Sequence, residues 1–238
     1  MTWSIVTHDA ATGAFAVAVA TCNFAVGATV PHIRAGVGAV ATQSISNRYL
    51  GPVVLDGLAR GLSPELAIAA AMAGDAGRGL RQVHAVDRHG RVAAWTGENC
   101  VMWCGSVAGP AVSVAGNMLA NGEVVPATLA AFQARMGGLA ERMVAGMQAG
   151  QAAGGDRRGQ QSAALKLFTT EDFADIDLRV DDHTAPLEEL ERLLGLWRTS
   201  RAKGLATAPR KADPAGVIDL DAIEAGWIAA GSELRLRR

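Results

Sequence analysis

TWSIVTHDAATGAFAVAVATC, residues 2–22, specifies the central β-structure of this chain. In its second half the bulky side chains of Phe15, Val17 and Val19 alternate with alanines. A period of two is typical of a β-strand, because successive side chains point to opposite faces of the sheet. The DAATG segment between the two halves supplies turn residues. The segment therefore predicts an antiparallel hairpin with one bulky and one small face.

The rest of the chain places strands and helices in blocks. Further strands are expected at GVGAVATQ, across a hairpin at QVHAVDRHGRVAAWTG, and at AVSVAGNML and SAALKLFT. Helical spacing predicts helices at NRYLGPVVLDGLARGL, SPELAIAAAMAG, PATLAAFQARM, GLAERMVAGMQAG and APLEELERLLGLWRTS. Ser63 is the expected N-cap of the second of these helices, because Pro64 follows it. This order predicts an α+β fold with mostly antiparallel sheets rather than regular βαβ units.

A change of composition near residue 200 predicts two parts. The segment RAKGLATAPRKADPAG, which begins at Arg201, is polar and contains Pro and Gly, as is typical of a linker. One short helix is expected after it, within DLDAIEAGWIAAG. We therefore expect a main domain over residues 1–200 and an appendage over residues 201–238.

Composition and charge indicate which classes of binding partner are not expected. The 238 residues include 22 Lys and Arg against 23 Asp and Glu, and 50% are hydrophobic, which favours a folded chain over a disordered one. Without a basic excess, a dedicated nucleic-acid binder is not expected. Residues 10–33 are uncharged but broken by Gly, Asn and Pro, so no membrane helix is expected, and no secretory signal is evident. With only three cysteines, the chain is expected in the cytoplasm.

Common cofactor and metal motifs lack the context they need. GVGAVA fits a loose dinucleotide-binding pattern, but it lies inside an expected strand. GGDRRGQQS lacks the lysine of a phosphate-binding loop. Cys100 and Cys104 have no second pair to complete a zinc site, so buried thiols are favoured. No metal and no organic cofactor is expected. The five histidines are scattered, and a spatial Ser/His/Asp set stays open.

Thr2 follows the initiator Met and begins the first expected strand. Removal of Met1 would leave a threonine whose hydroxyl is a nucleophile and whose own α-amine is a base. The unperturbed pKa of such an amine is about 7.7–8.0, close to the pH at which base catalysis works best. Met-Thr is a common start, so this feature alone does not decide the function.

Two further polar features stand out from an apolar background. Between Asp9 and Arg48, Arg34 is the only charged residue, which suits either carboxylate recognition or an ordinary loop position. The glycine-rich GGDRRGQQSAAL places Asp156 and Gln161 where a strand is expected to begin. These side chains fit an ordinary turn or the rim of a site.

Four segments together resemble a known family. They are the first 44 residues, GN at 116–117, AGQAAGGDRRGQQSAAL and DLRVDDH. In this combination the chain resembles the uncharacterised bacterial family DUF1028, which is placed in the N-terminal-nucleophile (Ntn) hydrolase-like superfamily. The resemblance covers about residues 1–200. It implies a four-layer αββα sandwich, in which two mostly antiparallel sheets lie between layers of helices.

The same resemblance implies roles for individual residues. Thr2 would be the nucleophile and its amine the base, and Asn117 would donate its amide to the oxyanion. One good oxyanion donor contributes about 3–4 kcal/mol. Arg34 would lower the pKa of that amine or bind a substrate carboxylate, and Asp156 and Gln161 would orient the amine or the substrate. Gln43 is a further residue expected to bind the substrate.

Two functions follow from the resemblance. The first is an amidohydrolase that cleaves a small amide or peptide-like substrate through an acyl-enzyme at Thr2. The alternative is a non-catalytic protein that keeps the sandwich for binding or assembly. Met136, Met143 and Met147 on the helices could serve self-association in that case, although core packing is favoured for them. A homo-oligomer is expected under both functions.

Overall fold

The computed structural model describes residues 2–232 and 235–236. The chain divides into two compact units, Met1–Leu190 and Glu191–Arg238. The division falls inside helix α5, Pro186–Leu196. It comes earlier than the expected boundary after residue 200.

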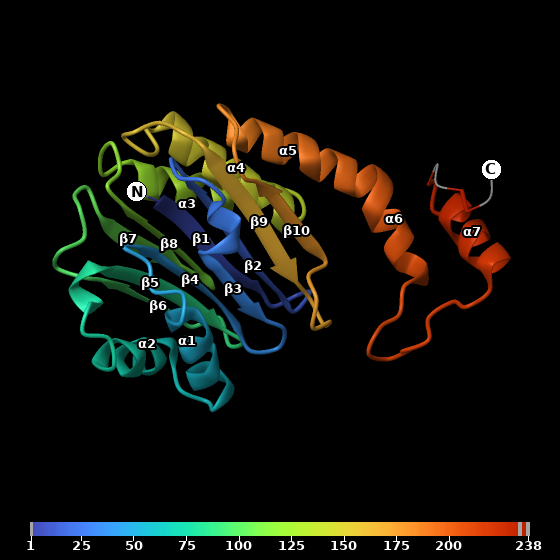
Figure 1. Ribbon diagram of the computed structural model, residues 1–238, viewed down its shortest axis with the longest axis horizontal. Helices are drawn as coiled ribbons and strands as arrows, with labels where there is room; N and C mark the ends of the chain where they lie inside the picture. Colours follow the sequence, from blue (N-terminus) through green and yellow to red (C-terminus); the bar gives the residue numbers. More distant parts are fainter. Residues whose placement is uncertain (1, 233–234, 237–238) are drawn as a thin grey trace. The chain divides into compact units, whose positions relative to one another are not determined.

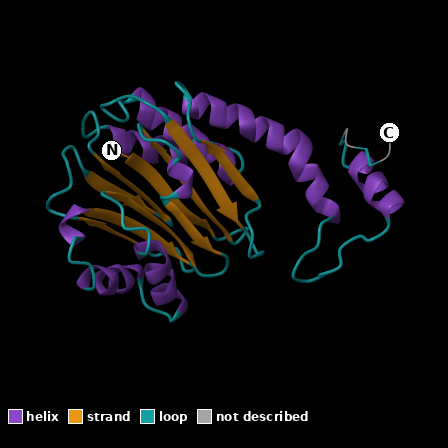
Figure 2. Ribbon diagram, in the orientation of Figure 1, coloured by secondary structure: helices purple, strands orange, loops and turns teal. Residues whose placement is uncertain are grey.

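Two antiparallel sheets form the centre of the first unit (Figure 1, Figure 2). The strands are β1 Thr2–Asp9, β2 Ala14–Thr21, β3 Pro31–Arg34, β4 Gly38–Ser44, β5 Arg81–Asp87, β6 Val92–Thr96, β7 Gly105–Gly109, β8 Val112–Asn117, β9 Ser162–Phe168 and β10 Ile176–Val180. The larger sheet has the order β10-β9-β2-β1-β8-β7, and the smaller has β3-β4-β5-β6. The predicted hairpin is β1 and β2, with Trp3 opposite Ala20. The prediction of a mixed chain with antiparallel sheets is confirmed.

Helices cover the outer faces of both sheets. They are α1 Leu50–Ala59, α2 Pro64–Ala73, α3 Val124–Ala134 and α4 Leu139–Ala152. Helices α1 and α2 pack on the smaller sheet, and α3 and α4 pack on the larger (Figure 1). Ser63 caps α2 as predicted, because its side chain accepts a hydrogen bond from the Leu66 amide at 3.4 Å.

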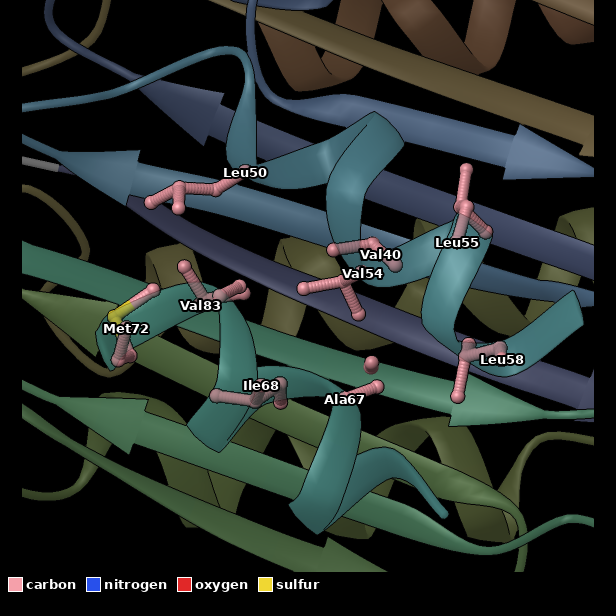
Figure 3. Close-up of a cluster of buried hydrophobic side chains, with 11 residues drawn as sticks. Val40, Leu50, Val54, Leu55, Leu58, Ala67, Ile68, Met72 and Val83 are labelled. Carbon is pink, nitrogen blue, oxygen red and sulfur yellow. The ribbon is translucent and has the colours of Figure 1, made fainter. Parts of the chain in front are cut away.

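The layer under α1 and α2 is an apolar core (Figure 3). Val40 of β4 and Val83 of β5 face Val54 and Ile68 of the two helices, and none of the four is more than 3% exposed. Full burial of one such side chain stabilises the fold by about 1.5–3 kcal/mol. This core fixes β4 and β5 in place, and the other faces of these two strands look toward the larger sheet.

The second unit contains short helical segments. Helix α7, Leu220–Ala229, falls where a short helix was expected, and the Asp219 side chain caps it by accepting from the Ala222 amide at 2.8 Å. Trp227 Nε1 donates to Thr207 Oγ1 at 3.0 Å and ties this helix to the preceding segment. Across residues 2–232 and 235–236, no helix has both the length and the apolarity needed to cross a membrane.

Candidate functional site

Thr2 lies at the edge of the larger sheet where β1 begins and its two neighbours, β2 and β8, end. It is the first residue of β1, and it pairs with Asn117, the last residue of β8. Its hydroxyl donates to Oγ1 of Thr21, the last residue of β2, at 3.2 Å. Thr2 is 5% exposed. The β-structure thus brings two hydroxyls and one amide side chain together at one edge of the larger sheet.

Behind Thr2, the inner faces of the sheets carry a buried network of amides, hydroxyls and one imidazole. Because side chains alternate along a strand, Thr2 and Ser4 share the face of β1 that looks toward the smaller sheet. Ser4 Oγ donates to Gln43 Oε1 at 2.7 Å and lies 2.8 Å from His84 Nε2. His84 Nδ1 lies 3.0 Å from Ser113 Oγ. The network therefore joins β1, β4, β5 and β8.

Gln82 connects this network to Thr2. Its Oε1 accepts from Gln43 Nε2 at 2.9 Å and from Asn117 Nδ2 at 3.0 Å. Its Nε2 donates to Thr96 Oγ1 at 3.0 Å and to the carbonyls of Gly116 and Gly105 at 2.8 and 3.3 Å. The two carbonyls can only accept, so they fix which end of the Gln82 amide faces Asn117.

The direction of the hydrogen bonds assigns the tautomer of His84. Gln43 Nε2 also donates to the Ala115 carbonyl at 3.2 Å, so Gln43 Oε1 faces Ser4. The single proton of the Ser4 hydroxyl then goes to Gln43, and His84 Nε2 must donate to Ser4. His84 Nδ1 accepts from Ser113. Complete burial lowers the pKa of His84 to about 3 and outweighs a hydrogen bond to the Ser113 backbone, which raises it, so the ring is neutral.

Asn117 pairs with Thr2, but its side-chain amide does not donate toward a substrate oxyanion. Nδ2 donates to the Thr2 carbonyl at 3.3 Å and to Gln82 Oε1 at 3.0 Å. An amide nitrogen has two hydrogens, and both are directed at protein acceptors. The geometry gives Asn117 the task of holding the Thr2 backbone. In this arrangement it does not present a donor to a substrate.

Asp156 and Gln161 belong to the loop that follows α4 and runs beside the end of β2. Asp156 Oδ2 accepts from the Cys22 amide at 2.8 Å and from Arg158 at 3.1 Å, and its side chain is fully buried. The Gln161 amide donates to the Thr21 carbonyl at 3.0 Å, while its side chain donates to Asp182 Oδ1 at 3.1 Å. Asp156 therefore fixes the loop next to Thr21, and Gln161 lies on its exposed side.

Arg34 is not brought to Thr2. It pairs with Gly38 at the start of β4, whereas Gln43 lies near the other end of that strand. Five residues of extended chain span about 17 Å. Arg34 instead donates to Asp56 Oδ1 at 2.8 Å. The residues that the sequence grouped as one site thus divide between the two ends of β4.

Two residues next to the network have a left-handed backbone. Ser44 follows Gln43 with φ 74°, and Met118 follows Asn117 with φ 57°. This conformation costs an L-residue about 1–2 kcal/mol, and such strain clusters at functional sites. The Met118 amide donates to the Val101 carbonyl at 2.7 Å, so the loop before β7 holds this turn.

The sequence pattern did not point to Ser4, Gln82, His84 or Ser113. The alternation gave no clear signal, because Gln82 and His84 occupy successive inward positions of β5, and polar residues at that spacing also fit a face exposed to water. Within the described residues, no group of three or more His, Cys, Asp or Glu side chains could hold a metal ion.

Comparison with known proteins places this architecture in a family. The model of the family of unknown function DUF1028 matches residues 2–190. The chain belongs to the DUF1028 family. The crystal structure of protein SPO2555 from Silicibacter pomeroyi, also of DUF1028, is 32% identical and superposes with a TM-score of 0.86, covering 92% of this chain and 96% of that chain.

A much more distant likeness is to Anbu, the ancestral beta-subunit from Yersinia bercovieri. It is 9% identical with a TM-score of 0.41, covering 82% of this chain and 93% of that chain. No curated protein matches the DUF1028 chain.

Proposed function

We propose that this DUF1028 chain is an Ntn amidohydrolase that cleaves a small amide or peptide-like substrate through an acyl-enzyme at Thr2. The supporting observation is the position of Thr2 where β1, β2 and β8 end, backed by a network that fixes its carbonyl. The packing of α1 and α2 on one sheet and of α3 and α4 on the other supports the four-layer αββα sandwich that this proposal includes.

Removal of Met1 is a chemical precondition of the mechanism. While the Met1–Thr2 peptide bond exists, the Thr2 nitrogen is an amide and has no basic lone pair. After removal, the free amine takes the proton of Thr2 Oγ as the oxygen attacks the substrate carbonyl. The resulting ammonium returns that proton to the departing amine, and an ester remains on Oγ. Water, deprotonated by the same amine, then hydrolyses the ester and frees the carboxylic acid.

The proposal divides roles among the neighbouring residues. Asn117 and Gln43 are positioning residues, because they act on Thr2 through its carbonyl and through Gln82. Asp156 fixes the loop that we place along one side of the substrate, and Gln161 offers an amide on the rim of that loop. No metal or organic cofactor is required, because nucleophile and base belong to one residue.

The test begins with the intact mass of the purified protein, which should lack Met1. A panel of aminoacyl and γ-glutamyl amides with a fluorescent leaving amine is then assayed. Wild type should cleave at least one of them, Thr2→Ala should lose about 10³-fold or more in kcat/KM, and Thr2→Ser should keep part of the rate. A β-lactone probe should add its mass to wild type and not to Thr2→Ala.

A matched control separates the amine from the hydroxyl. One glycine inserted between Met1 and Thr2 keeps the Thr2 hydroxyl but leaves its nitrogen acylated, and it should abolish cleavage and β-lactone labelling. Equal cleavage by wild type and Thr2→Ala would remove Thr2 from the mechanism. Retention of Met1 in wild type, together with no cleavage of any amide, would favour the non-catalytic binding or assembly protein.

A further inference from the structure

A separate pocket lies between β3, β9 and α1, on the side of the sandwich where Arg34 was found. Its volume is about 280 Å³. The side chains of Arg34, His32 and Lys166 supply its polar wall, and those of Pro52, Leu55 and Phe168 supply much of the apolar remainder. Such a combination of a few polar groups with an apolar lining is typical of a small-molecule site.

The polar wall of this pocket is basic. Arg34 Nη2 is 2.8 Å from Asp56 Oδ1, and Lys166 Nζ is 3.1 Å from Asp177 Oδ2. Neither of these carboxylates lines the pocket. Each ion pair joins its cation to one carboxylate oxygen, so further N–H groups of the guanidinium and of the ammonium are left for a second acceptor.

His32 supplies an independent observation. Its Nε2 atom is buried and, within the described part of the chain, has no hydrogen-bond partner. Its ring packs against Gly51 in the first turn of α1 so closely that a Cβ at that position would overlap it. Burial lowers the pKa of His32, a hydrogen bond to the Thr29 backbone raises it, and the Lys166 and Arg48 cations lower it further.

The charges around His32 favour a neighbouring anion. Both neighbouring charges that act on the ring are positive. A bound oxyanion would offset that repulsion and would favour a protonated ring.

We propose that this pocket binds a small organic oxyanion, in which Arg34 and Lys166 contact the carboxylate or phosphate and Leu55, Pro52 and Phe168 contact an attached apolar group. The pocket is near the lower end of the size range of ligand sites, which limits the ligand to about the size of one ring with one anionic group. The site is distinct from Thr2 and does not depend on the proposed hydrolysis.

The full chain is titrated with benzoate and, separately, with phenyl phosphate. Saturation-transfer NMR measures binding of each probe, and the imidazole signals of His32 report on the pocket. At least one probe should bind and shift the His32 signals, and its presence should raise the pH at which His32 titrates. Arg34→Met and Lys166→Met should each weaken binding about tenfold or more, since each removes a charge-assisted hydrogen bond. Binding of one probe only would tell whether the anionic group is a carboxylate or a phosphate.

Controls keep the result interpretable. Lys203→Met removes one lysine from the second unit and should bind like wild type, as should Thr2→Ala. The double variant Lys166→Met/Asp177→Asn removes the ion pair without leaving an unpaired carboxylate, and it should bind as weakly as Lys166→Met. The proposal is overturned if neither probe binds at about 10 mM, if folded Arg34→Met and Lys166→Met bind like wild type, or if Thr2→Ala alone loses binding.

Discussion

The layer between the two sheets has an apolar half and a polar half, although the same strands build both. Strand β1 contributes Val6 to the apolar half and Ser4 to the polar half. The apolar half also contains Phe15, Val17, Val19, Ala39, Ala41 and Val86. The polar half consists of Ser4, Gln43, Gln82, His84, Ser113 and Asn117, all of which are at most 1% exposed.

The two halves stabilise the fold by different physical means. Apolar burial has no direction, so an apolar layer tolerates small shifts of one sheet over the other. A buried amide must find its partners at one distance and angle, and an unpaired one costs about 1–3 kcal/mol. The polar half therefore fixes the relative position of β1, β4, β5 and β8, and Thr2 lies at its edge.

The sharpest test of this difference substitutes one buried residue in each half, Gln82 in the polar half and Phe15 in the apolar half. Gln82→Met removes five hydrogen bonds, so the side-chain NH₂ groups of Gln43 and Asn117 each keep only one acceptor, and the buried Gly116 carbonyl loses a donor. The free energy of unfolding should fall by about 4 kcal/mol or more. Phe15→Leu in the apolar half should cost only about 1 kcal/mol. Urea unfolding followed by circular dichroism measures both.

Equal losses in the two variants would contradict the distinction between the halves. A small loss in Gln82→Met, with Phe15→Leu near its expected value, would show that the network relaxes around the gap. In that case the amides of Gln43 and Asn117 must find other acceptors.

The apolar half could be predicted from the sequence, because alternation in AFAVAVATC identifies β2 and its bulky face directly. The edge strands β3, β7 and β10 could not be predicted in this way. They are four or five residues long, they carry Gly, Pro or charged residues, and they lie at the margins of their sheets. A strand with one neighbour and little burial needs no strong alternation, so its sequence carries a weak signal.

The polar half illustrates a second limit. Gln82 and His84 are two residues apart on one strand, and polar residues at that spacing usually indicate a face exposed to water. Only the pairing of the two sheets shows that this face is buried. Arg34 is the converse case: its isolation in sequence drew attention to it, but the position of β3 at the far end of β4 separates it from Thr2.

His84 makes the stability of the polar half depend on pH. Burial lowers the pKa of His84 to about 3 in the folded chain, against about 6.5 when unfolded, so the unfolded chain binds the proton more readily. The part of the free energy of unfolding that depends on a neutral His84 is fully present above pH 6.5 and is lost as the pH falls from 6.5 toward 3. Between pH 7.5 and pH 4.5 the loss should be about 2–3 kcal/mol. Urea unfolding at these two pH values measures it.

The comparison variant for this prediction is His84→Gln, which cannot take up the proton. Its overall stability is expected to be lower, but the difference between its two pH values should shrink by about 2–3 kcal/mol relative to wild type. His89→Gln, at an exposed turn, should leave the wild-type difference unchanged. If His84→Gln and wild type lose the same stability on acidification, other groups carry the pH dependence.

The smallest expected effect concerns two residues with a left-handed backbone, one at the end of the polar half and one at the end of the apolar half. Ser44 adjoins Gln43 in the polar half, and Ala111 occupies the β7–β8 turn at the other end with φ 55°. Glycine relieves the left-handed strain but has a more flexible unfolded state, so Ser44→Gly and Ala111→Gly should each gain about 0.5–1 kcal/mol. The urea midpoint, at unchanged slope, measures the gain. If Ala111→Gly gains as expected while Ser44→Gly loses stability, the Ser44 side chain itself supports the turn beside the network, and the strain there is held by more than the backbone.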